Sequence, residues 1–118
     1  MNELSTGMNA QNKMDRESLE KVARFFSAFS DATRLAILME LKQGAQGVGE
    51  LVDRVGGSQG NISKQLNLLY EHGLLSREKR GTKVFYSIRD KIIFQLCRQV
   101  CDKLNRDAQS GSELIYHI

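Results

Sequence analysis

The residues with the clearest chemistry are polar and lie outside an apolar stripe between Ser58 and Asn67. Amides of Gln and Asn can form paired hydrogen bonds with adenine, and Ser or Lys can reach base edges or phosphate oxygens. The same pattern can also be a merely solvated face of an amphipathic helix. The basic segment that follows favours DNA contact, and the predicted reading residues are Ser58, Gln59, Asn61, Ser63, Lys64, Gln65 and Asn67.

A basic, glycine-containing segment follows this stretch. Between Ser58 and Lys91 the chain carries seven basic and three acidic residues, although the net charge of the whole chain is only +3. Gly81 permits a tight hairpin turn, and the cations around it can grip phosphates or enter a minor groove. The same cations would also protect an exposed strand edge. The predicted DNA contacts in this segment are Arg77, Arg80 and Lys83.

Two thiols form the other candidate site. Cys97 and Cys101 are four residues apart, so on a helix they share a face, and a symmetric dimer could gather four of them. One interpretation is that both are small hydrophobes in an interface. The other is a thiol sensor that binds a thiophilic metalloid such as arsenite, or that reacts with reactive sulfur or an oxidant. The sequence leaves both open.

The elements that position these residues follow from apolar periodicity and capping residues. Gly56-Gly57 is a turn and Gln46-Gly47 is a loop. Ser30-Asp31 can cap the helix that follows it, and Ser58 is an N-cap. The pattern predicts a mainly α chain with a small β-hairpin in the order α-α-α-α-β-β-α. The expected helices begin near Arg16, span 31–43 and 48–55, run from Ser58 to about His72 and cover 90–106, and the expected strands are 74–80 and 83–88.

Length and composition indicate one small domain. We expect a flexible arm over 1–15, a DNA-binding and dimerisation domain over 16–106, and a tail over 107–118. No apolar run is long enough to span a membrane and the N-terminus has no signal-peptide pattern, so we expect a cytoplasmic protein. A chain this short gains from burying more surface in a dimer.

The combined segments resemble the ArsR/SmtB family of winged helix-turn-helix repressors. The resemblance rests on FFSAFSDATRLAILMEL (25–41), GELVDRV (49–55), SQGNISKQLNLLYEHGLL (58–75) and RGTKVFYSI (80–88), and covers roughly residues 17–106. It implies a homodimer through the first and last helices that binds a palindromic operator in double-stranded DNA, with half-sites ~34–36 Å apart. The expected interface residues are Leu19, Val22, Phe26, Ile93, Leu96, Val100 and Leu104.

The metal sites of that family are expected to be absent. One family site uses cysteines at the start of the third helix, where this chain has 48–51 without a thiol. A second uses Asp and His from paired last helices, and here only Asp90 matches. The later ligand positions hold Ile92, Lys103 and Arg106, which cannot replace imidazoles as zinc ligands.

Two other functional classes fit the residues less well. An enzyme would need a nucleophile paired with a base, a phosphate loop or a ligand cluster, and the sequence has none of these patterns. A protein-interaction winged helix without DNA binding would have a neutral or acidic wing and an apolar recognition helix, which is the opposite of this chain. The sequence therefore predicts a DNA-binding repressor without enzymatic activity, whose inducer is undefined.

Overall fold

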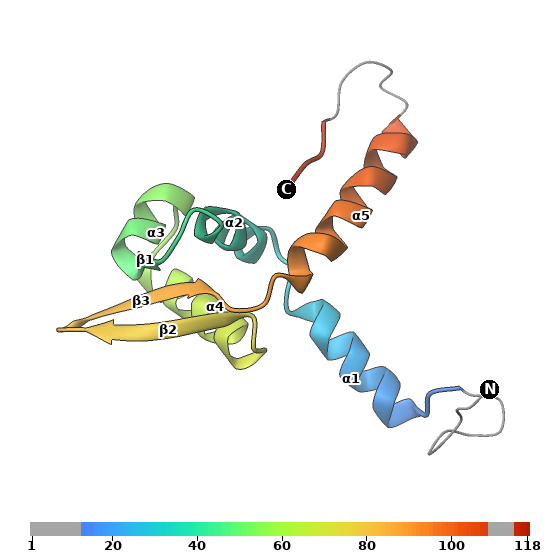
Figure 1. The fold of residues 1–118 in the computed structure, drawn as a ribbon, viewed down its shortest axis with the longest axis horizontal. Helices are drawn as coiled ribbons and strands as arrows, with labels where there is room; N and C mark the ends of the chain where they lie inside the picture. Colours follow the sequence, from blue (N-terminus) through green and yellow to red (C-terminus); the bar gives the residue numbers. More distant parts are fainter. Residues whose placement is uncertain (1–12, 109–114) are drawn as a thin grey trace.

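The computed structural model describes residues 13–108 and 115–118. Helices α2 to α4 and a small sheet form a body, and helices α1 and α5 project from it (Figure 1). The elements are α1 Arg16–Ser27, α2 Ala32–Leu41, β1 Gln46–Gly47, α3 Val48–Val55, α4 Gln59–Glu71, β2 Leu75–Arg80, β3 Lys83–Ile88 and α5 Ile92–Ala108.

Side-chain caps set where three helices begin, and those at Asp31 and Ser58 were predicted. Asp15, Asp31 and Ser58 each accept a hydrogen bond from the backbone N–H three residues later, at 2.9, 3.0 and 3.1 Å. Such caps satisfy amides that have no partner inside the helix. The bond from the Ser18 backbone also lowers the pKa of Asp15 below its ordinary value.

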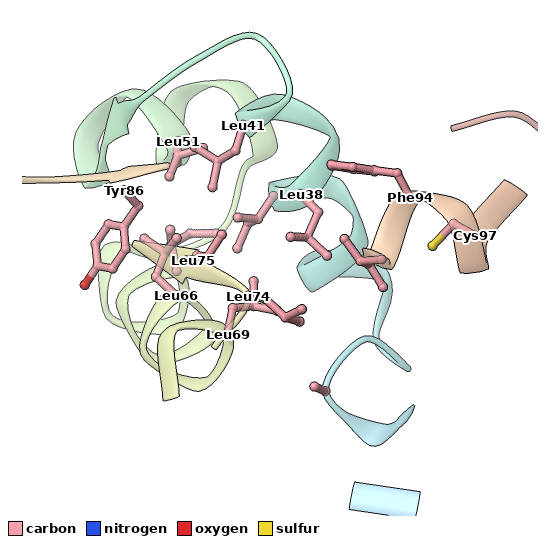
Figure 2. Packing of buried hydrophobic residues seen from close by; sticks show 14 residues of the cluster. Leu38, Leu41, Leu51, Leu66, Leu69, Leu74, Leu75, Tyr86, Phe94 and Cys97 are labelled. Carbon is pink, nitrogen blue, oxygen red and sulfur yellow. The ribbon is translucent and has the colours of Figure 1, made fainter. Parts of the chain in front are cut away.

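The hydrophobic core lies between α2, α4 and the inner face of the sheet (Figure 2). Leucines dominate it, and α5 contributes only the residues of its first turns. Figure 2 shows Cys97 at the margin of this cluster, beyond Phe94. Fully buried members, with at most 2% of their surface exposed, are Ile37, Leu38, Leu41, Leu51, Ile62, Leu66, Leu69, Leu74, Leu75 and Ile93.

Gln46 and Gly47 form a strand, so the prediction of a loop there was wrong. Strand β1 pairs antiparallel with β3, with Gln46 opposite Tyr86 and Gly47 opposite Phe85, giving the sheet order β1-β3-β2. The buried Gln46 side chain donates to the Glu40 carbonyl at 2.8 Å. Apolar periodicity could not predict this short strand, because its partner strand lies about 40 residues later in the chain.

The last helix begins two residues later than predicted. The Asp90 carboxylate accepts a hydrogen bond from the Ile92 N–H at 3.0 Å, which places Asp90 outside the helix. Helix α2 likewise ends at Leu41 rather than Gln43, where the chain turns. These are differences in helix ends, and the order of the seven predicted elements is confirmed.

The two projecting helices are poorly covered by the rest of the chain. No residue of α1 is buried, and α5 buries only Ile93, Phe94 and Cys97. The radius of gyration is 17.8 Å, whereas compact domains of this size are nearer ~13–14 Å. The fold therefore leaves surface available for a second subunit.

The chain end folds back along α5. The Asn105 side chain accepts hydrogen bonds from the N–H groups of Ile115 and Tyr116 and donates one to the Tyr116 carbonyl, at 2.9–3.1 Å. Ile118 packs against the core. Most of the predicted N-terminal arm (1–12) and part of the predicted tail (109–114) lie outside the described residues.

Candidate nucleic-acid interface

The N-terminal half of α4 presents the predicted reading residues. Gln59, Asn61 and Lys64 are exposed and Ser63 is half-buried, while Asn67 is exposed one turn further along. Ser58 is also exposed, but its hydroxyl already accepts the capping bond. The turn before the helix needs the two glycines, because Gly56 and Gly57 have φ of +94° and +92°.

Gln65 is not on this surface, and its prediction as a DNA contact is corrected. Only 9% of its surface is exposed, and both ends of its amide are engaged within the chain. Its oxygen accepts a hydrogen bond from Arg34 Nη1 at 2.5 Å, and its nitrogen donates to Asn61 Oδ1 at 3.1 Å. Gln65 therefore fixes the orientation of the Asn61 side chain through a hydrogen bond from the buried side of α4.

Sequence reasoning missed Arg34, the centre of this network. Its guanidinium also donates to the Ala28 carbonyl at 2.6 Å and to the Ser27 carbonyl at 3.0 Å. One side chain thus connects the end of α1, helix α2 and the recognition helix α4. Its partner Gln65 lies 31 positions away, and no local pattern signals such a pairing.

Strands β2 and β3 form the predicted wing, closed by Gly81 at φ +63°. Lys83 is exposed and has no ion-pair partner within the described parts of the chain. Arg80 is exposed too, but it lies on the Phe85 ring and pairs with Glu78, Nη2 to Oε1, at 2.9 Å. That pair is exposed and weak, so a phosphate can replace the Glu78 carboxylate.

Arg77 has a structural contact that the sequence did not reveal. Its guanidinium carbon lies 3.9 Å from the centre of the Tyr70 ring. This cation–π contact joins the wing to the C-terminal half of the recognition helix. The side chain is still exposed, so it remains a predicted phosphate contact.

A strip of uncovered apolar side chains marks the faces predicted to dimerise. Leu19, Val22 and Phe26 on α1 are 40–50% exposed, and Val100 and Leu104 on α5 are 57% and 40% exposed. Leu96 is half-buried.

Ile93 is the exception in this set. It is fully buried in the chain's own core, so it has no surface to offer a partner. Its prediction as an interface residue was wrong because periodicity identifies an apolar face but not what covers each position along it.

Cys97 and Cys101 are both free thiols, one buried and one half-buried. Burial, and to a smaller extent the neighbouring Cys101, raises the pKa of the Cys97 thiol. Within residues 13–108 and 115–118, no three His, Cys, Asp or Glu side chains gather in a way that could hold a metal ion.

Comparison with known proteins assigns the family. Residues 31–77 match the family described as bacterial regulatory protein, arsR family. A helix-turn-helix transcriptional regulator of Methanocaldococcus jannaschii is 38% identical over 85 residues, which cover 71% of this chain and 96% of that protein. The SmtB repressor homologue of Synechocystis is 31% identical, over 77% and 69% of the two chains. The chain belongs to the ArsR family.

Solved structures agree with this assignment. The crystal structure of Rv0081 from M. tuberculosis aligns with a TM-score of 0.71 at 28% identity, covering 80% of this chain and 98% of that one. The homodimeric winged helix-turn-helix DNA-binding domain Mb0332 of Mycobacterium bovis aligns at 0.65 and 27% identity, over 89% and 97%.

This ArsR-family protein is a transcriptional regulator of a DNA-binding family, and the predicted fold and functional class are confirmed. The family consists of regulators rather than enzymes. None of the described helices is both long and apolar enough to cross a bilayer.

Proposed function

We propose that the protein is a homodimeric repressor that occupies a palindromic operator and leaves it after an inducing signal. The observation that carries the proposal is the placement of Gln59, Asn61 and Lys64 on the exposed N-terminal half of α4, beside a basic wing. Helix N-termini of this kind enter the major groove, while basic wings contact the flanking backbone.

Two further observations support the dimer. The apolar side chains of these strips on α1 and α5, Leu19, Val22, Phe26, Val100 and Leu104, stay 40–57% exposed in the described chain, and a two-fold partner would bury them. Mb0332, with a similar fold, is homodimeric.

The similar Synechocystis protein is a repressor, which supports the proposed repression. A two-fold dimer would place its recognition helices ~34–36 Å apart, which requires a symmetric operator. Because such a protein works where the DNA lies, the proposal places it in the cytoplasm.

The reading surface is tested with the double variant Gln59→Ala/Ser63→Ala. Fluorescence anisotropy on DNA from the protein's own upstream region should show a loss of operator preference, since each paired base contact contributes ~1–3 kcal/mol of discrimination. Affinity for unrelated DNA should hardly change. The control variant Ser30→Ala/Gln43→Ala removes exposed polar groups away from α4 and should bind as the parent does. Intact operator binding by the double variant would show that the reading surface lies elsewhere.

A thiol-based inducing signal is the second candidate. It is favoured by two free thiols one turn apart on α5, the helix that carries part of the proposed dimer face. A thiophilic metalloid such as arsenite would bond to Cys97 and Cys101, and reactive sulfur or an oxidant would modify them. Either change adds bulk or polarity beside the core and would disturb the α5 geometry that sets helix spacing.

The thiol candidate is tested by repeating the operator titration with arsenite, zinc, persulfide or peroxide. A thiol sensor would lose DNA affinity with one of these reagents, and the variants Cys97→Ser and Cys101→Ser would not respond. Equal binding by reduced and treated protein would assign both cysteines to packing alone.

A further inference from the structure

A cavity of about 470 Å³ lies where the body of the protein meets α5. Its lining comes from the end of α2 and the loop after it, the end of β3, and Lys91 with the first turns of α5. It includes no residue of α4 or of the wing tip. It is therefore separate from the DNA-reading surface. Its volume lies in the range of pockets that hold small organic ligands.

The cavity combines an apolar floor with a positive rim. Leu41, Ile88 and Phe94 supply the apolar surface. Lys42, Lys91 and Arg98 surround it, and no acidic residue lines the cavity. The Lys42 ammonium lies 5.1 Å from the centre of the Phe94 ring, which directs one of these charges over the floor.

The rim charges are not neutralised within the chain. In the part of the protein that the structure describes, none of Lys42, Lys91 and Arg98 forms an ion pair with a carboxylate. Three like charges around one apolar hollow repel one another, and an anion between them would relieve that repulsion. The matching ligand has one anionic group and an apolar body.

The cavity lies on the side of α5 that faces away from the proposed dimer contact. Phe94 and Arg98 are four residues apart and share one face of α5, and Lys91 directly precedes the helix. At 3.6 residues per turn, this face lies opposite Leu96, Val100 and Leu104, the side expected to meet the partner.

We propose that this cavity binds a small organic anion with an aromatic or branched apolar body, and that its occupancy changes operator affinity. An occupant would touch α2 and β3 in the body and α5 at the same time. It would thus favour one angle between α5 and the body, and in the proposed dimer this angle sets the spacing of the two recognition helices. The regulatory half of the proposal rests on the proposed function.

Binding is tested with 1-naphthoate and its uncharged analogue 1-naphthamide on the full chain. NMR titration should shift the backbone amides of Gly44, Ser87 and Gln95, which line the cavity. The amide analogue should bind at least ten-fold more weakly. The chain contains no Trp, so naphthoate fluorescence can provide an independent affinity. Absence of saturable binding, equal binding of the two probes, or shifts confined to other regions would overturn the proposal.

The charge requirement is tested with Lys91→Gln/Arg98→Gln. Both side chains are exposed, so the variant should fold, and naphthoate affinity should fall on the order of ten-fold. The control Lys21→Gln/Arg24→Gln removes the same charge from exposed positions on α1 and should bind naphthoate as the parent does. If Lys91→Gln/Arg98→Gln instead leaves naphthoate affinity unchanged and lowers only DNA affinity, these cations contact phosphates and the proposal fails.

The regulatory half is read from operator titrations with and without naphthoate. A shift in operator affinity that disappears in Lys91→Gln/Arg98→Gln supports it. Unchanged operator affinity with a saturated cavity overturns the regulatory half and leaves the proposed function intact. If the protein binds no operator at all, the proposed function fails, while the NMR titration still decides whether the cavity binds the anion.

Discussion

At the scale of single residues, Gln65 shows how a polar side chain near a reading surface can serve it indirectly. It supplies an acceptor to Arg34 and a donor to Asn61, and it is almost completely covered. An asparagine held in this way loses less side-chain freedom when it meets a base, since its orientation is set beforehand. If Asn61 reads a base as proposed, its discrimination would therefore depend on a residue that lies outside the proposed reading surface.

Replacing Gln65→Leu should both destabilise the fold and weaken sequence preference. The change leaves one Arg34 donor without its partner in a half-buried place, which costs about 1–3 kcal/mol. Urea unfolding measures the first effect, and the ratio of operator to unrelated-DNA affinity measures the second. Asn67→Leu, on the exposed face of α4, should alter stability by no more than about 0.5 kcal/mol. Equal stability of Gln65→Leu and the parent would show that the network contributes little.

The pH profile for the reaction of Cys97 with iodoacetamide should lie at higher pH than that of an unfolded thiol. Burial raises the pKa of Cys97, so at a given pH less of it is thiolate, the reactive form. Alkylation rates of Cys101→Ser, measured against pH with and without urea, should show the folded profile displaced to higher pH. By linkage, the stability associated with this thiol is present below the unfolded pKa and is lost as pH rises through the folded pKa. Superimposable profiles would contradict this assignment.

At the scale of elements, a carboxylate on the wing competes with the proposed phosphate contact of Arg80. Glu78 forms an ion pair with Arg80, while Lys83, across the hairpin turn, has no such partner in the described chain. The two cations should therefore contribute to DNA binding in different ways, although both lie at the wing tip.

Glu78→Gln should strengthen DNA binding of any sequence, because it frees Arg80 and removes a negative charge near the phosphates. Lys83→Gln should weaken binding uniformly and reduce the slope of log affinity against log salt by about 1. Anisotropy titrations at several salt concentrations measure both. Glu71→Gln removes an equal charge at the end of α4, outside the wing, and provides the comparison for Glu78→Gln. An unchanged salt slope for Lys83→Gln would remove that residue from the DNA surface.

At the scale of the whole molecule, α1 and α5 project from the body with partly exposed apolar faces, which the proposed dimer would bury. Val100→Glu puts a charge where a partner would bury it and should dissociate the dimer, with loss of operator affinity. Gln95→Glu adds the same charge to the opposite face of α5 and should leave the dimer intact. Analytical ultracentrifugation reports the oligomeric state of each variant. A Val100→Glu dimer would place the interface elsewhere.

Local patterns in the sequence determined the element order, the N-caps at Asp31 and Ser58, the Gly56-Gly57 turn and the exposed amides of α4. Those features depend on backbone hydrogen bonds and side-chain spacing within a few residues. Only tertiary structure decided that Gln65 faces Arg34, that Gln46 pairs with Tyr86, and that Ile93 is covered by its own chain while Val100 is not. Each of these depends on which distant segment packs against a given face. The residues next to it in sequence do not determine which segment that is.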